Sequence, residues 1–161
     1  DDVLIKLRLL LERMGLSLNE EKTKRIEARH VSFNFLGFNI RYDRDIHGRS
    51  GGYWNIQPSK KSEQKVRGKI KEFLKTHGHS PAKDIAKGIN AKIRGWLNYF
   101  EIKEVSYPAM SKRRLRYYLS ERLNRYYKRK SQRKCRLYGK NAFEVLVNKF
   151  GMIDPTKYTF N

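Results

Sequence analysis

The side chains in this sequence best suited to chemistry are the arginines, lysines and tyrosines of its C-terminal third. Between residues 112 and 140, 13 basic side chains accompany one acidic side chain, Glu121, and five tyrosines are interleaved among them. On a helix, such cations can follow a phosphate backbone over several turns, and a tyrosine at the rim can stack on a base or sugar. The residues expected to face away from the core and bind nucleic acid are Lys112, Arg113, Arg116, Arg125, Lys128 and Arg129.

Four tyrosines in this stretch divide into two pairs. Tyr117 and Tyr127 are expected at the surface, and Tyr118 and Tyr126 in the core. Further cations surround the apolar positions of two preceding helical stretches. These candidates for nucleic-acid binding are Lys60, Lys61, Lys65, Lys69, Lys87 and Arg94. Because guanidinium groups can grip phosphate with two hydrogen bonds and stack on bases, we expect the later arginines to contribute more than the lysines.

The net charge predicts a polyanionic partner. The chain of 161 residues has 37 Lys and Arg against 16 Asp and Glu, a formal charge of +21. Residues 1–50 contribute 10 basic and 8 acidic side chains, whereas residues 51–161 contribute 27 and 8. Such a concentration of like charge would repel itself without a partner, which can be RNA or DNA. An anionic membrane surface is the physical alternative, but packing of the helices on one another explains their apolar stripes better.

Other classes of site have little support. Cys135 is the only cysteine, which excludes an intramolecular disulfide and suits the bacterial cytoplasm or a reducing organelle rather than secretion. His77 and His79 are the only close histidine pair, and no acidic residue stands beside them at a metal-ligand spacing, so no metal site is expected. Nucleophilic triads and phosphate-cradling glycine loops are absent, so we expect no small-molecule substrate. No membrane span or signal peptide is visible either.

Ahead of the basic region the sequence predicts a helix and a β-hairpin. Apolar residues crowd one side of residues 4–14, and Gly15 ends this helix as a C-terminal cap. Residues 31–35 alternate between apolar and polar side chains, as in a strand. Residues 35–42 are expected to extend that strand, with Gly37 marking a bulge or a close backbone approach. Residues 43–52 then form the turn before a return strand at residues 53–56.

Three amphipathic helices are expected next. Their apolar stripes are Val66, Ile70, Phe73 and Leu74; Ile85, Ile89, Ile93, Trp96, Leu97 and Phe100; and Leu115, Leu119, Leu123 and Tyr126. Ser80 is the expected N-cap of the second helix and Pro81 its first residue. Gly88 and Gly95 could let another helix approach closely. The third helix should run from about residue 111 to 131, and a short apolar helix near residues 142–150 lies in a tail. The expected fold class is α+β, a helix with a hairpin followed by an antiparallel three-helix bundle.

Three segments together resemble one family, the reverse transcriptases encoded by group II introns, which also act as splicing maturases. Residues 15–24 (GLSLNEEKTK) resemble the family's last palm helix and the loop that follows it. Phe35, Leu36, Gly37 and Phe38 resemble the strand that serves as its primer grip. Residues 89–100 (INAKIRGWLNYF) resemble the signature of its thumb or maturase-specific domain, often named domain X. Order and spacing agree over roughly residues 3–150.

The resemblance implies a division of the chain and a role for each part. Residues 1–57 would be the end of the palm with its primer-grip hairpin, and residues 58–161 the thumb or domain X. The primer grip would hold the 3′ end of the growing strand, and the thumb helices would hold the RNA/DNA template-primer. Domain X would bind intron RNA and help it fold for splicing. Lys22 becomes a candidate for the catalytic lysine that polymerases use near the departing pyrophosphate.

Two departures from the family limit what this chain should do alone. The fingers and most of the palm, with its Tyr-Ala-Asp-Asp strand, have no counterpart here, and no endonuclease domain follows. We therefore expect part of a longer enzyme that would use Mg²⁺, with no cofactor and no polymerase activity in this chain alone. Two alternatives stay open: a non-enzymatic basic RNA-binding protein of a ribonucleoprotein, and the thumb of a CRISPR-associated or retron reverse transcriptase.

Overall fold

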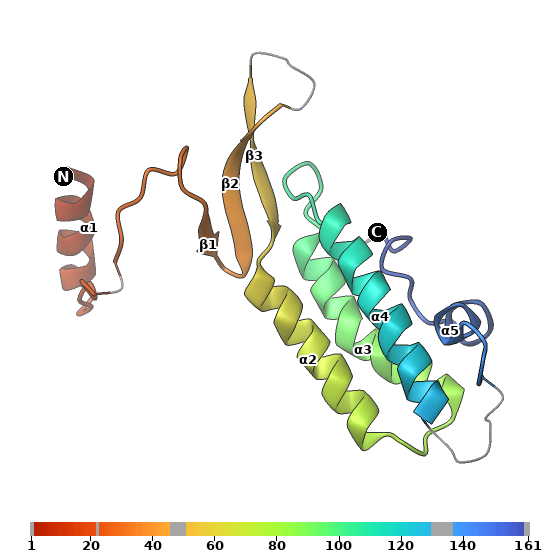
Figure 1. Ribbon diagram of the computed structural model, residues 1–161. Coiled ribbons are helices and arrows are strands. Elements are labelled where there is room, and N and C mark those ends of the chain that lie inside the picture. Colours follow the sequence, from red (N-terminus) through yellow and green to blue (C-terminus); the bar gives the residue numbers. More distant parts are fainter. Residues whose placement is uncertain (1, 22, 46–50, 130–136, 160–161) are drawn as a thin grey trace.

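The chain forms an N-terminal helix, a small antiparallel sheet and a helical bundle, in that order. The computed structural model describes residues 2–21, 23–45, 51–129 and 137–159. Its elements are α1 (Asp2–Arg13), β1 (Phe33–Phe35), β2 (Phe38–Arg44), β3 (Gly52–Pro58), α2 (Lys60–Thr76), α3 (Ala82–Phe100), α4 (Ala109–Arg129) and α5 (Ala142–Phe150). Figure 1 shows α1 standing apart, the sheet in the middle and the bundle at the other end. The expected α+β fold class is confirmed.

The N-terminal helix forms where the sequence predicts it. Gly15 adopts a left-handed φ of 70°, and the backbone N–H of Leu16 donates to the carbonyl of Leu11 over 2.9 Å, which satisfies one of the last carbonyls of α1. No residue of α1 is buried, so its apolar side chains, among them Val3 and Leu10, face solvent.

The sheet has three strands, and the prediction of one long first strand is wrong. Leu36 and Gly37 both have positive φ, 47° and 85°, and they form a two-residue turn between β1 and β2. Phe35 pairs with Phe38 across this turn, and β2 then pairs with β3. Positive φ at both central positions is the feature of a type I′ hairpin turn, which usually has Asn or Gly at its first position. Because Leu36 occupies the first position, the sequence pattern gives no sign of this turn.

The bundle buries the three predicted stripes. Val66, Ile70 and Leu74 of α2 pack with the Ile85, Ile89 and Ile93 side chains of α3 and the leucines of α4. Ser59 is the N-cap of α2, and its Oγ accepts the Ser62 N–H over 3.2 Å. The N-cap of α3 is Pro81 instead of the expected Ser80. The Pro81 carbonyl accepts the N–H groups of Asp84 and Ile85, and its side chain makes no capping hydrogen bond.

Two glycines and three tyrosines show where the predicted helix faces lie in the structure. A Cβ on Gly88 would lie 2.0 Å from the Phe73 ring, so α2 and α3 do approach closely there, whereas Gly95 faces open space. Tyr117 is 71% exposed, as expected. Tyr127 is only 4% exposed, so its predicted surface position is wrong, and Tyr126 beside it packs against the core from a partly buried position. The buried line on α4 therefore runs through Leu115, Leu119, Leu123 and Tyr127, with Tyr127 in place of Tyr126.

The short C-terminal helix belongs to the bundle and is not a tail. Ala142, Phe143 and Leu146 of α5 are buried in the same core, together with Met152 beyond it. α5 packs against α3 and α4, and α2 packs against the same two helices. The helices therefore follow the order α2, α3, α5 and α4 around a shared core, and the predicted three-helix bundle gains a fourth member.

Candidate nucleic-acid interface

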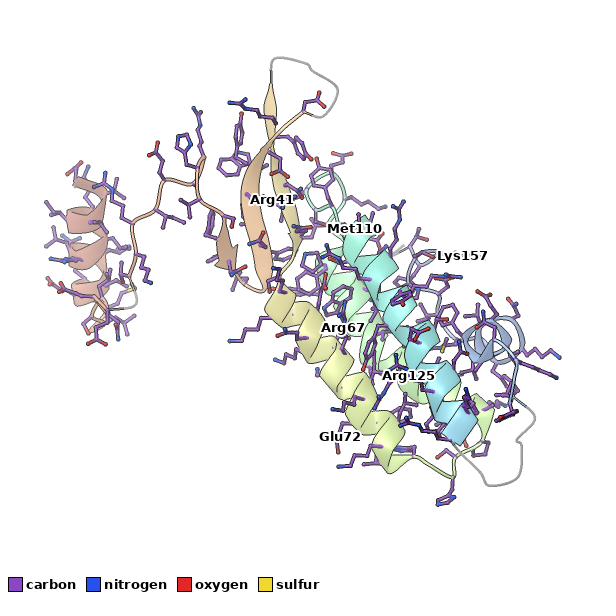
Figure 2. All side chains as sticks on the ribbon, in the orientation of Figure 1. Arg41, Arg67, Glu72, Met110, Arg125 and Lys157 are labelled. Atoms are coloured by element: carbon purple, nitrogen blue, oxygen red, sulfur yellow. The ribbon has the colours of Figure 1, made fainter. Side chains whose placement is uncertain are left out.

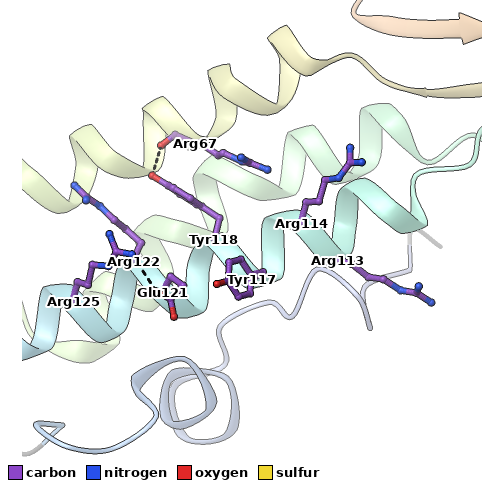
Figure 3. A pocket seen from close by; sticks show the side chains of 8 residues that line it. All are labelled: Arg67, Arg113, Arg114, Tyr117, Tyr118, Glu121, Arg122 and Arg125. Carbon is purple, nitrogen blue, oxygen red and sulfur yellow. Dashed lines mark hydrogen bonds and ion pairs between the residues drawn. The ribbon is translucent and has the colours of Figure 1, made fainter.

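The face between α2 and α4 carries a groove lined by arginines, here called the arginine groove. Its first part is a cavity of about 500 Å³. The residues that line it are Arg67, Arg113, Arg114, Tyr117, Tyr118, Glu121, Arg122 and Arg125 (Figure 3). A second cavity of about 320 Å³ continues it toward the end of α4, where Lys75, His79 and Arg129 join the lining. Figure 2 places Arg67 and Arg125 on the two helices that flank this face.

Two rows of side chains on α4 build the groove. Positions four apart lie above one another on a helix, so Arg113, Tyr117 and Glu121 form one row and Arg114, Tyr118 and Arg122 the next. The second row faces α2: the Tyr118 hydroxyl donates to the Arg67 carbonyl over 3.1 Å, and the Arg67 guanidinium lies 5.5 Å from the centre of the Tyr118 ring. The first row therefore projects outward.

A buried glutamate fixes the head of the groove. Glu63 of α2 accepts a 2.7 Å hydrogen bond from the Ser111 hydroxyl. Its carboxylate also pairs with Arg67 at 3.2 Å and with Arg114 at 3.4 Å. One carboxylate thus neutralises part of the charge of two arginines and orients both.

Other cations of the groove are available to an external anion. Arg125 pairs with Glu121 at 3.1 Å in an exposed i, i+4 contact, which water screens strongly. Among the described residues, no ion-pair partner is found for Arg113, Arg122 or Arg129, which line the groove, or for Lys128, which is exposed on α4 outside it. The groove therefore presents uncompensated positive charge along most of α4.

Two residues of the predicted interface serve the fold instead. Lys112 is buried, and its Nζ donates to Glu101 Oε1 over 2.6 Å and to the Tyr158 carbonyl over 2.9 Å. Arg116 binds Glu144 at 2.7 Å and Asp154 at 3.1 Å, and its guanidinium lies 5.1 Å from the centre of the Phe143 ring. The expectation that Lys112 faces away from the core is wrong, because the C-terminal segment covers it. Arg116 stays partly exposed, but its charge is compensated within the chain.

A second basic surface lies between α2 and α3 and is called the lysine groove. It holds a cavity of about 570 Å³. Lys61, Lys65, Lys69 and Lys92 are among its lining residues, with Val66, Trp96, Tyr99 and Phe100 supplying the apolar ones. Leu36 and Gly37 also line it, so this groove reaches the turn between β1 and β2.

That turn is held firmly against the bundle. The Tyr99 hydroxyl donates to the Leu36 carbonyl over 2.8 Å, and the Ser59 N–H donates to the Gly37 carbonyl over 2.9 Å. Phe38 is buried against Tyr99 and Phe100, with ring centres 5.6 Å and 4.7 Å away. Leu36 itself is 68% exposed. The four residues predicted as a primer grip thus form a rigid corner with an apolar tip.

Several predicted residues lie outside the two grooves, and several groove residues were not predicted. Lys60, Lys87 and Arg94 are exposed on α2 and α3 but line neither groove, and Lys22 lies outside the described residues. Sequence reasoning missed Arg67, Lys92, Arg114 and Arg122 as groove residues. Arg114 and Arg122 lie within the basic run already singled out, and their four-residue spacing about Tyr118 was the available signal. Arg67 and Lys92 become neighbours of these surfaces only through tertiary packing.

Residues 89–100, which resemble the signature of domain X, form hydrogen bonds with several other parts of the chain. The Asn90 side chain donates to the Gly151 carbonyl over 2.9 Å and accepts the Ile153 N–H over 2.8 Å. Trp96 Nε1 donates to Ser62 Oγ over 3.0 Å, and Asn98 accepts the Tyr158 hydroxyl over 2.7 Å. With Tyr99 on the hairpin turn, the polar side chains of this segment tie α3 to α2, the sheet and the C-terminal segment.

Within residues 2–21, 23–45, 51–129 and 137–159, no group of three or more His, Cys, Asp or Glu side chains could hold a metal ion. In the same part of the chain, no helix has the length and apolar content that crossing a membrane requires.

Comparison with known proteins assigns the bundle to a family. The curated proteins contain no match to this chain. Residues 63–142 match the family model described as group II intron, maturase-specific domain. The match runs from the first turn of α2, through α3 and α4, to the first residue of α5, and so contains most residues of both grooves. Residues 63–142 therefore form a group II intron maturase-specific domain.

Proposed function

We propose that this chain binds the RNA of a group II intron through the arginine groove and so helps the intron fold for splicing. The observation that carries the proposal is the line of unpaired arginines on α4, inside the segment that matches the maturase-specific domain. From Arg113 to Arg129 the helix rises about 24 Å, which spans several phosphates of one strand. Arginine suits this role because its planar group can take two phosphate oxygens at once.

The test compares two triple variants that remove equal charge. The arginine triple is Arg113, Arg122 and Arg129 changed to Gln, and the lysine triple is Lys61, Lys65 and Lys69 changed to Gln. If each arginine meets one phosphate of a duplex stem, the slope of log affinity against log salt should fall by about 3 in the arginine triple. Circular dichroism checks that both variants fold. A larger loss of affinity for structured RNA in the lysine triple would contradict the proposal.

We further propose that the lysine groove and the Leu36–Gly37 turn contact an RNA/DNA template-primer. The supporting observation is that an exposed apolar tip, anchored by Tyr99, sits at the end of a groove with four lysines. Such a surface fits the end of a duplex and the backbone beside it. The lysine triple should then weaken binding to a recessed RNA/DNA hybrid more than the arginine triple does. Equal losses in both triples would remove this second role.

Polymerase chemistry is proposed only for a longer protein. Two-metal phosphoryl transfer needs clustered carboxylates. No group of three or more acidic, histidine or cysteine side chains that could hold a metal ion lies among the described residues, so they do not fit the Mg²⁺ that the resemblance implies for the full-length enzyme. A reducing compartment, the bacterial cytoplasm or an organelle, is our proposal for where the intron RNA is met, and the single cysteine supports it.

A further inference from the structure

Tyr117 is the most unusual side chain of the arginine groove. Its ring is 71% exposed, although it lies in the middle of a 21-residue helix whose other face is fully packed. Figure 3 shows Tyr117 between Arg113 and Arg114 on one side and Arg122 and Arg125 on the other. No hydrogen bond or ring contact joins Tyr117 to another described residue. Its aromatic face is therefore open to a ligand.

The neighbouring Tyr118 shows what a structural tyrosine on this helix looks like. Its hydroxyl is bonded to the Arg67 carbonyl, the Arg67 guanidinium covers its ring, and it packs against the core. Tyr118 with Arg67 forms a fixed wall, and Tyr117 projects beside it. The groove thus combines a rigid wall with an exposed aromatic platform.

The charges around this platform favour an anion with a flat ring. Five arginines and one glutamate line the cavity. Arg67 and Arg114 are held by Glu63, and Arg125 by Glu121, which leaves Arg113 and Arg122 without an ion pair among the described residues. These two lie on either side of Tyr117 along α4. A cavity of about 500 Å³ falls in the range of small-molecule sites, so one nucleotide fits its size.

We propose that this cavity binds a single unpaired nucleotide of RNA, with its base stacked on Tyr117 and its flanking phosphates held by Arg113 and Arg122. The inference rests on the proposed function, and it adds the kind of RNA feature that the groove selects. Bases inside an A-form stem are stacked on one another and offer no free face, whereas a bulged or looped base can be turned out onto an aromatic side chain. The arginine groove would therefore prefer a stem with a bulge to a continuous stem.

The test uses the 161-residue chain and two fluorescein-labelled RNA hairpins. One hairpin has a fully paired stem, and the other has the same stem with one bulged adenine. Wild-type protein should bind the bulged hairpin more tightly. Tyr117→Ala should weaken binding of the bulged hairpin about 5- to 100-fold and leave the paired one within about twofold, because a base stack is lost only in the first. Tyr117→Phe keeps the ring and should retain wild-type affinity.

A spectroscopic readout separates stacking from general contact. With 2-aminopurine in place of the bulged adenine, binding of wild-type protein and of Tyr117→Phe should change the fluorescence as the base leaves its RNA neighbours for the tyrosine ring. Tyr117→Ala should not give this change at saturating protein. Tyr107→Ala, which removes another exposed ring outside the groove, is the matched control and should behave as wild type.

Failure of this inference differs from failure of the proposed function. Should wild-type protein and Tyr117→Ala bind both hairpins equally while the arginine triple still weakens both, the nucleotide pocket is wrong and RNA binding by the groove stands. Absence of any RNA binding by the wild-type protein would overturn both.

Discussion

Lys112 and Arg116 show how ion pairs within the chain can neutralise a cation on α4. Both stand in the basic run, yet each is neutralised within the chain, Lys112 by Glu101 and Arg116 by Glu144 and Asp154. The Lys112 side chain is only 9% exposed. A buried cation of this kind binds no external phosphate unless its internal partner is released, which leaves an uncompensated carboxylate behind.

Lys112→Met should therefore destabilise the fold and leave RNA affinity unchanged. The change keeps the length of the side chain but removes the hydrogen bonds to Glu101 and the Tyr158 carbonyl, at a cost of about 1–3 kcal/mol. Urea unfolding measures the loss. Lys128→Met on the exposed face of α4 is the control and should stay within about 0.5 kcal/mol of wild type. A stable Lys112→Met protein with weakened RNA binding would return Lys112 to the interface.

The ionisation of Asp154 makes the stability of the bundle depend on pH in the acidic range. Burial by itself would raise the pKa of Asp154, but hydrogen bonds from Thr156 and Arg116 and the charge of Arg116 bring the pKa below its ordinary value of 3.8. Because the folded-state pKa is depressed, the ionised carboxylate stabilises the fold above its unfolded-state pKa of about 3.9, and this contribution is lost as pH falls through the folded value.

Asp154→Asn should therefore lower stability most at neutral pH. We expect a loss of about 1–3 kcal/mol at pH 7, because a charge-assisted hydrogen bond to Arg116 is replaced by a weaker one. Below pH 4 the difference from wild type should shrink as wild-type Asp154 becomes protonated. Urea unfolding at pH 7 and pH 3 measures both values. A difference that stays constant across this interval would contradict the assignment.

At the scale of elements, the regular patterns could be predicted from the sequence and the tertiary ones could not. The stripes of α2, α3 and α4 fix three helices and their buried faces, because a period near 3.6 has one apolar side whatever packs on it. The role of α5 and the ion pairs of Arg116 depend on where the later part of the chain packs; Asp154, for example, lies 38 residues after Arg116 in the sequence. No local pattern encodes that packing. The hairpin turn was missed because Leu36 occupies a position where turn residues are expected.

The contribution of α5 can be measured through its phenylalanines. Phe143 is fully buried in the common core, so Phe143→Ala should cost about 3–5 kcal/mol and keep a single unfolding transition. Phe150 lies at the other end of the same helix and is exposed, so Phe150→Ala should have a small effect. Thermal unfolding followed by circular dichroism compares the two. If α5 unfolds in a separate transition in Phe143→Ala while the rest of the bundle keeps its stability, the claim that α5 is part of the common core would be wrong.

At the scale of the whole molecule, charge is arranged on the two flanks of α2. The arginine groove lies toward α4 and the lysine groove toward α3, and the hairpin turn closes the end of the latter. The sequence predicts the excess of charge and the basic run on α4. It does not predict which cations are neutralised within the fold, because ion pairs such as Glu63 with Arg114 join residues far apart in the chain. Among the described residues, the buried Glu63 and Lys112 have ion-pair partners, whereas both grooves carry cations without one.

The most direct test of the account is a salt titration of RNA binding by the wild-type chain. If the grooves contact six or more phosphates of a duplex stem, affinity should fall about a thousandfold or more between roughly 50 and 200 mM salt, because condensed counterions are released on binding. The plot of log affinity against log salt should be linear and steep. An affinity that changes little over this interval would contradict the claim that these two surfaces bind nucleic acid through its phosphates.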